Sequence, residues 1–341
     1  MVTEVLKAGE KPQEVLNKAS ELLNSGNLVA FPTETVYGLG ANALDKEACL
    51  NIFKAKGRPG DNPLIVHIAD PSDAEDIAYT NHLYYKLAYE LMPGPLTIIL
   101  PKKDVIPGEV TAGLDSVAVR CPEHPVANEL IRVAGIPIAA PSANTSGKPS
   151  PTTAQHVFED MNGKIPLIID GGECDVGVES TVIKITDDEI ILLRPGAVTA
   201  EMLLEFCDNV SIAGAVKEEL KAGDTPLSPG MKYKHYAPKA ELYLVDDRSV
   251  NFVPFIKEKQ QKESCAVMCY DEEFSLLENK NLLPVGSRYD IKSQTKRLFN
   301  LLREADKLGV DTIYAHLPDD EGESLAIYNR MIRACGHKIV K

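Results

Sequence analysis

The sequence lacks the features that mark membrane-spanning and secreted proteins. No apolar run among its 341 residues reaches the roughly 20 residues that a membrane-spanning helix needs. The first fifteen residues, MVTEVLKAGEKPQEV, contain no apolar core of a secretory signal. We therefore expect no contact with a membrane and a cytoplasmic location.

Several metal and nucleophile signatures are also missing. The seven cysteines are scattered, and Cys265 and Cys269 have no second Cys or His pair at zinc-ligand spacing. An odd set of this kind indicates reduced thiols rather than a disulfide framework. The sequence contains no G-x-x-x-x-G-K-[ST] loop and no G-x-S-x-G elbow. We therefore expect neither a zinc finger, nor a Walker-type nucleotide site, nor catalysis by a thiol or an elbow serine.

Positive charge is scarce in the first part of the chain. Through Val210 there are 16 Lys and Arg against 30 Asp and Glu, whereas the remainder has 20 of each. The net charge of −14 therefore belongs to the first part, which repels nucleic acid at long range. We expect direct tRNA binding to be weak or absent.

Short apolar runs alternate with amphipathic stretches, which predicts an α/β fold with a mostly parallel or mixed sheet. In the first part, strands are expected at 28–31, 64–68, 97–100, 117–120, 137–140, 167–170, 181–185 and 190–193. Helices are expected there at 12–26, 45–54, 72–91, 124–134 and 152–160. A proline-rich, acid-free stretch, TPLSPGMKYKHYAPKA, then separates a smaller α/β region, with strands at 241–245, 266–269, 282–285 and 312–315 and helices at 293–308 and 324–335. We predict domains at 1–210 and 241–341 and a linker at 211–240.

Two segments place charged or polar side chains next to expected strands. In Lys54–Ile68, Lys56 and Arg58 flank a glycine, a pairing that suits phosphate oxygens. In Pro137–Thr152, a buried strand runs into Ser142 and Asn144, which offer neutral hydrogen-bond donors to an anion. Taken alone, each segment also fits an ordinary turn.

A third segment, Phe31–Ala43, contains Gly38-x-Gly40-x-x-Ala43, which looks like a dinucleotide-binding turn. In that turn the first glycine follows the strand directly, whereas here five residues from Thr33 to Tyr37 intervene after Pro32. We expect instead a polar loop leaving a buried strand.

In this order, the motifs strongly resemble the threonylcarbamoyl-AMP synthase family, with its YrdC-like fold, in the long two-domain form. The motifs are FPTETVYGLGANA, KGRP followed by NPL and His67, PGPLT, VAVRCPEHP, APSANTSGKPSPT, ESTVI and LRPGA. The segment SPGMKYKHYAP matches the interdomain linker of the long form. The resemblance covers nearly all of the chain and is weakest in the second domain. It implies a twisted mixed sheet with flanking helices and a smaller Rossmann-like C-terminal α/β domain.

The resemblance also implies a reaction and its participants. L-threonine, bicarbonate or carbon dioxide, and ATP would form threonylcarbamoyl-AMP and pyrophosphate, a nucleotidyl transfer with Mg²⁺ accompanying ATP through ligands that the sequence leaves unknown. The product would pass to transferase proteins that modify tRNA. Carbamate is already anionic, so the reaction needs aligned charges rather than a strong base.

Residue roles follow from the matching motif positions. The implied catalytic residues are Lys56, Arg58, Ser142 and Asn144. The implied ATP contacts are Arg58, Asn62, Ser116, Ser142, Ser150, Arg194, His235 and Tyr236. The implied threonine contacts are Thr35, His67, Arg120, the Ala140 backbone and Ser180, with Arg120 facing the carboxylate.

Two other functions remain as alternatives. One is a carbamoyl-adenylate-forming domain of hydrogenase maturation, which sits in longer chains with zinc-finger modules that this sequence lacks. The other is a non-catalytic RNA-binding module, which the acidic first domain disfavours.

Overall fold

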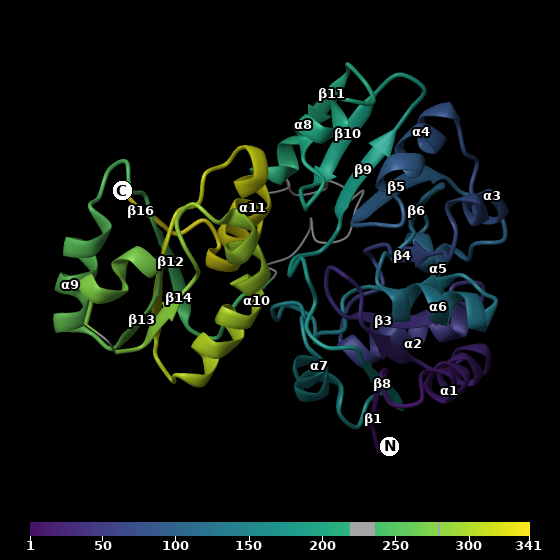
Figure 1. The fold of residues 1–341 in the computed structure, drawn as a ribbon, viewed down its shortest axis with the longest axis horizontal. Coiled ribbons are helices and arrows are strands. Elements are labelled where there is room, and N and C mark those ends of the chain that lie inside the picture. Colours follow the sequence, from purple (N-terminus) through teal and green to yellow (C-terminus); the bar gives the residue numbers. More distant parts are fainter. Residues whose placement is uncertain (219–235, 279) are drawn as a thin grey trace. The chain divides into compact units, whose positions relative to one another are not determined.

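The computed structural model describes residues 1–218, 236–278 and 280–341. The chain forms two compact units (Figure 1). The second contains the described residues from Tyr236 onward and also includes two short pieces of the preceding chain, 147–149 and 176–178. Most of the expected linker lies outside the described residues, so the boundaries 1–210, 211–240 and 241–341 remain a prediction.

The first unit contains an eleven-stranded mixed sheet, in the order β1-β8-β2-β3-β7-β4-β6-β5-β9-β10-β11. Its strands are β1 Glu4–Lys7, β2 Val29–Phe31, β3 Gly38–Asn42, β4 Ile65–His67, β5 Leu96–Pro101, β6 Ser116–Arg120, β7 Ile138–Ala139, β8 Leu167–Asp170, β9 Thr181–Ile185, β10 Ile190–Arg194 and β11 Val210–Ile212. The predicted fold class is confirmed.

Helices flank this sheet. They are α1 Pro12–Asn24, α2 Lys46–Lys56, α3 Ala74–Ile77, α4 His82–Leu91, α5 Gly108–Thr111, α6 Pro125–Ala134, α7 Ala154–Met161 and α8 Ala200–Leu203. Helices α1 and α6 lie side by side (Figure 1) and bury their apolar faces in one core cluster with β2 and β8. Local signals set several helix ends: Asp45 accepts hydrogen bonds from the first turn of α2, and Gly57, with φ of 62°, ends that helix.

The expected single helix over 72–91 is wrong. A 3₁₀ turn, Pro71–Asp73, and α3 are separated from α4 by an extended break. In the break, Ala78 pairs with Lys102 in a β-bridge and the Tyr79 amide donates to the Pro101 carbonyl. These bonds to a distant segment, together with the Asn81 cap of α4, outweigh the helical pattern.

The glycines of the Phe31–Ala43 segment form a strand, and only the residues before them form the expected loop. Gly38–Asn42 is β3, antiparallel to both β2 and β7. A Cβ at Gly40 would lie 2.7 Å from the Phe31 ring and 2.8 Å from an Ile138 methyl. Gly40 therefore permits close strand packing, and the rejection of a dinucleotide-binding turn is confirmed.

The second unit contains a five-stranded sheet in the order β14-β13-β15-β12-β16, in which all pairs are parallel. Its strands are β12 Glu241–Val245, β13 Cys265–Cys269, β14 Leu282–Pro284, β15 Thr312–His316 and β16 Ile339–Val340. Its helices are α9 Phe252–Lys262, α10 Ile291–Lys307 and α11 Leu325–Cys335. Across the described residues, no helix is both long enough and apolar enough to cross a membrane.

Candidate active site

Two site residues lie next to each other at the ends of neighbouring strands. His67 ends β4, Arg120 ends β6, and the two are register partners in a parallel pair. The carboxyl ends of parallel strands are where α/β sheets bind ligands. The strand pairing therefore brings together two of the residues that the sequence assigned to threonine.

Arg120 is held by a carboxylate that the sequence analysis missed. Its Nη2 lies 2.7 Å from Oε1 of Glu34, and both side chains are almost fully buried. Nε of Arg120 and Oε2 of Glu34 have no hydrogen-bond partner among the described residues. A buried pair with one free donor and one free acceptor is costly unless a third molecule satisfies both.

His67 is buried beside this pair and neutral. Burial, with the nearby Arg120 charge as a second cause, lowers the pKa of His67 to about 3. The ring lies edge-on to Phe31, with centroids 6.2 Å apart. Thr33 and Thr35 flank Glu34 in the chain; their hydroxyls lie 2.9 Å apart and both side chains are buried. A neutral imidazole and hydroxyls there suit an uncharged polar part of a ligand.

Lys56 and the Ser142–Asn144 segment also meet, in a way that changes the expected role of the lysine. Lys56 is the last residue of α2 and is buried rather than part of a solvated turn. Its Nζ donates to the Ser142 carbonyl at 2.5 Å and to the Asn144 carbonyl at 2.6 Å. The Ser142 hydroxyl in turn donates to Oδ1 of Asn144. Lys56 therefore braces the loop that carries the two neutral donors.

Arg58 and Asn62 form a second group. Arg58 lies just beyond α2 and donates through Nη2 to the Asn62 carbonyl at 2.8 Å. The amide side chain of Asn62 is fully buried, and neither its oxygen nor its nitrogen has a partner among the described residues. An amide left in this state is a candidate ligand contact.

The β9–β10 region brings together a residue expected to bind threonine and one expected to bind ATP. Arg194 donates through Nε to the Ser180 carbonyl and through Nη2 to its hydroxyl, each at 3.1 Å. The Ser180 hydroxyl also lies 2.8 Å from that of Thr97. Glu179, the residue before Ser180, accepts a hydrogen bond from the Ser150 hydroxyl at 2.5 Å, and both side chains are buried.

The remaining expected residues are dispersed. Ser116 begins β6 and Arg120 ends it, so they lie on one face but roughly 13 Å apart at about 3.3 Å per residue. The Ala140 amide bonds the Ile65 carbonyl within the sheet. Tyr236 belongs to the second unit and stacks on Phe299. His235 lies outside the described residues.

Buried, incompletely bonded charges at strand ends of an α/β sheet are typical of an enzyme's active site. Comparison with known proteins agrees. A family model described as telomere recombination matches residues 21–196, and the model for the threonylcarbamoyl-AMP synthase C-terminal domain matches 198–336. The threonylcarbamoyl-AMP synthase of Pyrococcus abyssi is 44% identical over 100% of both chains.

The likeness extends to further relatives and to solved structures. The threonylcarbamoyl-AMP synthase of Bacillus subtilis is 43% identical over 100% of this chain and 97% of its own. A crystal structure of P. abyssi Sua5 complexed with L-threonine, 43% identical, superposes with a TM-score of 0.89, covering 100% of this chain and 99% of the other. This chain belongs to the threonylcarbamoyl-AMP synthase family, in its two-domain form, and is an enzyme of that class.

Glu34 is the main residue that sequence reasoning missed. It stands inside the FPTET motif, between two threonines, and there it is indistinguishable from a solvated loop acid. The signal that could have found it is Arg120, a cation at the end of an apolar strand that requires a buried anion. The partner's position in space, however, depends on the pairing of β2, β3, β7, β4 and β6.

Proposed function

We propose that this enzyme condenses L-threonine, bicarbonate and ATP into threonylcarbamoyl-AMP, with release of pyrophosphate. The amine of threonine and bicarbonate form a carbamate with loss of water; a carbamate oxygen then attacks the α-phosphorus, and pyrophosphate leaves. The observation that carries the proposal is the buried Glu34–Arg120 pair beside neutral His67. A zwitterionic amino acid has the two groups that the pair lacks, namely an acceptor for Nε of Arg120 and a donor for Oε2 of Glu34.

In this proposal the remaining residues divide between the two substrates. Arg120 binds the threonine carboxylate, Glu34 accepts a hydrogen bond from the amine, and Thr35, His67, the Ala140 backbone and Ser180 surround the rest. The proposed ATP contacts remain the eight residues that the motifs imply: Arg58, Asn62, Ser116, Ser142, Ser150, Arg194, His235 and Tyr236. Asn62 supports this assignment, because its buried amide has both a donor and an acceptor to offer a nucleotide.

In this proposal, the charges next to the reacting atoms come from the last residue of α2 and from Arg58, two residues further on. Arg58 supplies a guanidinium for phosphate oxygens, and Lys56 supplies a buried ammonium that holds the Ser142–Asn144 loop. Such fixed charges and donors stabilise a transition state without having to reorganise during the reaction.

Magnesium enters this proposal with ATP. Among the described residues, no group of three or more His, Cys, Asp or Glu side chains is placed to hold a metal ion. We therefore assign no resident metal site among the described residues and no step of the reaction to protein-bound metal; the ATP phosphates would supply ligands to the magnesium. The proposed product passes to transferase proteins acting on tRNA. Because the enzyme needs ATP as a substrate, we propose a cytoplasmic location.

Pyrophosphate release tests this function. The full chain is incubated with ATP, magnesium chloride and bicarbonate, with and without L-threonine, and with L-alanine as a control that lacks the side-chain hydroxyl. We expect release that depends on L-threonine. Release that is absent, or that is the same without threonine, would contradict the proposal, and binding of tRNA without any turnover would favour an RNA-binding module.

The role of Glu34 has its own test. Glu34→Gln keeps the shape of the side chain but removes its charge, so it weakens the hold on the threonine amine. We expect weaker binding of L-threonine and unchanged binding of 3-hydroxybutyrate, which has the carboxylate and the hydroxyl but no amine. Equal losses for both ligands would show that Glu34 acts only by positioning Arg120.

A further inference from the structure

One end of the sheet in the first unit carries a polar residue on each of five neighbouring strands. In the order β4, β6, β5, β9 and β10, these residues are His67, Arg120, Thr97, Ser180 and Arg194. Strand β5 is antiparallel to β6 with Ile98 opposite Val119, which sets Thr97, one residue earlier, level with Arg120. Strand β9 is parallel to β5 and begins directly after Ser180. Thr97 is the one residue of this row to which neither the motifs nor the proposed function assigns a role.

Thr97 is unusual within β5 because its neighbours there are apolar. The strand reads LTIILP, and every residue of it before Pro101 is buried. A buried hydroxyl costs free energy unless it is hydrogen-bonded, and valine has the same branched shape without that cost. The Thr97 hydroxyl lies 2.8 Å from that of Ser180 and has no other hydrogen-bond partner among the described residues. Any role of this hydroxyl is therefore exerted through Ser180.

The two hydroxyls together have one proton more than they can use. Arg194 donates through Nη2 to Oγ of Ser180, so this bond consumes no hydroxyl proton. The bond between Thr97 and Ser180 consumes one, whichever residue donates. The other proton has no acceptor among the described residues, although both side chains are fully buried. A ligand that brings an acceptor atom would satisfy this spare proton.

The surroundings decide which hydroxyl carries the spare proton. If Ser180 donated to Thr97, the spare proton would belong to Thr97, inside a strand whose other side chains are apolar. If Thr97 donates, Oγ of Ser180 accepts from both Thr97 and Arg194, which uses its two lone pairs. The spare proton is then that of Ser180, just before β9, at the end of the sheet where the other site residues lie. This second arrangement leaves the proton where a ligand can accept it.

Arg194 sets the kind of acceptor that suits this proton. A hydroxyl oxygen that accepts from a guanidinium donates its own proton more strongly, and a strong donor pairs best with an anionic oxygen. In the strand order, Ser180 lies between Arg120, proposed to bind threonine, and Arg194, proposed to bind ATP. The acceptor therefore belongs to the place where the two substrates meet.

We propose that Thr97 is a positioning residue, which donates to Ser180 and so directs the Ser180 proton to an anionic oxygen at the reacting centre. That oxygen belongs either to the carbamate or to a phosphate of ATP, two sources of the same chemistry. The inference rests on the proposed function for the identity of the substrates, whereas the hydrogen bonds within the protein do not depend on it.

Titration calorimetry on the full chain measures binding without turnover. The ligands are L-threonine, with and without bicarbonate in the buffer, and α,β-methylene-ATP with magnesium, whose α–β bridge is not cleaved. Thr97→Val removes the hydroxyl and keeps the branched shape, whereas Thr97→Ser keeps the hydroxyl. Thr186→Val is the matched control, because Thr186 is exposed and follows the opposite end of β9.

We expect Thr97→Val to weaken binding of the ligand that carries the oxygen about tenfold. Thr97→Ser should restore the dissociation constant to within about twofold, and Thr186→Val should leave it unchanged. A loss seen for threonine only when bicarbonate is present identifies the carbamate, and a loss confined to the nucleotide identifies a phosphate. No loss for any ligand, the same loss for every ligand, or a loss for threonine that is independent of bicarbonate would overturn the proposal.

A double substitution tests whether Thr97 acts through Ser180. In the background of Ser180→Ala, Thr97→Val should cause no further loss of binding, and additive losses would overturn the proposal. Urea denaturation of each variant exposes a purely structural role, in which Thr97→Val lowers stability and leaves all dissociation constants unchanged. If Ser180→Ala fails to fold, the single variants of Thr97 still decide the outcome. Failure of the proposed function is seen separately, as a lack of threonine-dependent pyrophosphate release by the unaltered chain.

Discussion

Removing Glu34 should be unusually destabilising for a loop substitution. The side chains of Glu34 and Arg120 are 6% and 4% exposed, and their charged atoms lie 2.7 Å apart. Glu34→Ala leaves the guanidinium buried without a counter-charge, and breaking a buried pair in this way costs about 3–5 kcal/mol. We expect a loss of that size in the free energy of unfolding of the first unit.

The chain offers a matched control at its surface. Lys18 and Glu4 form an ion pair at 2.5 Å, but both side chains are 46% exposed. Breaking that pair with Glu4→Ala should cost about 0–1 kcal/mol, because water solvates the lysine that remains. Each variant therefore removes a glutamate carboxylate from an ion pair of similar length, and the two pairs differ in burial.

Urea denaturation followed by far-UV circular dichroism measures both losses. The protein contains no tryptophan, so fluorescence offers only tyrosine signals. Because there are two units, the curve is analysed as two transitions where two are resolved. If Glu34→Ala costs no more than Glu4→Ala, the pair does not stabilise the fold and the argument from its burial fails.

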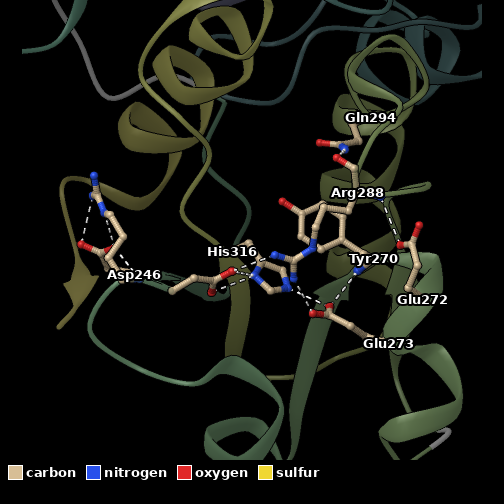
Figure 2. Close-up of polar contacts among 9 residues, drawn as sticks. Asp246, Tyr270, Glu272, Glu273, Arg288, Gln294 and His316 are labelled. Atoms are coloured by element: carbon tan, nitrogen blue, oxygen red, sulfur yellow. Dashed lines mark hydrogen bonds and ion pairs between the residues drawn. The ribbon is translucent and has the colours of Figure 1, made fainter.

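Three other predictions concern separate parts of the molecule. Lys56→Met should abolish pyrophosphate release and also lower stability, by about 1–3 kcal/mol for each of the two loop carbonyls that loses its hydrogen bond from Lys56; normal turnover would remove Lys56 from the mechanism. Gly196→Ala places a Cβ 2.5 Å from the Thr181 amide and should lower the melting temperature, whereas Gly108→Ala, with open space around it, should not; calorimetry compares the two. Burial alone lowers the pKa of His316, but its bonds to Asp247 and Glu273 (dashed lines at His316 in Figure 2) outweigh burial and raise the pKa above 6.5. The stability that this group contributes is therefore complete below pH 6.5 and lost as pH rises through the folded-state pKa, and denaturation in a pH series that shows no such loss would contradict it.

Much of the fold could be predicted because its signals are local. Asp45 caps α2 and Gly57 ends it, and both roles can be predicted from neighbouring residues alone. The apolar faces of α1 and α6 likewise repeat at the helical period, and β4, β6 and β8 are short, continuously buried runs. The order of the motifs was sufficient to identify the family.

The errors arose where distant segments compete with local pattern. The helix expected over 72–91 breaks because Ala78 and Tyr79 pair with the end of β5 and the residue beyond it, which no local window contains. Gly38–Asn42 has little strand propensity, yet it becomes β3 because it pairs with β2 and β7, and at Gly40 the Phe31 ring and an Ile138 methyl leave no room for a Cβ.

For the candidate site, the sequence by itself determined which side chains are present, through motifs whose residue types suit anions and an amino acid. Only the tertiary structure decided their partners. It joined Glu34 to Arg120, turned Lys56 inward to brace the Ser142–Asn144 loop, and made His67 neutral. Each of these outcomes depends on burial and on the register of strands far apart in the chain, because the free energy of a charge is set by what surrounds it.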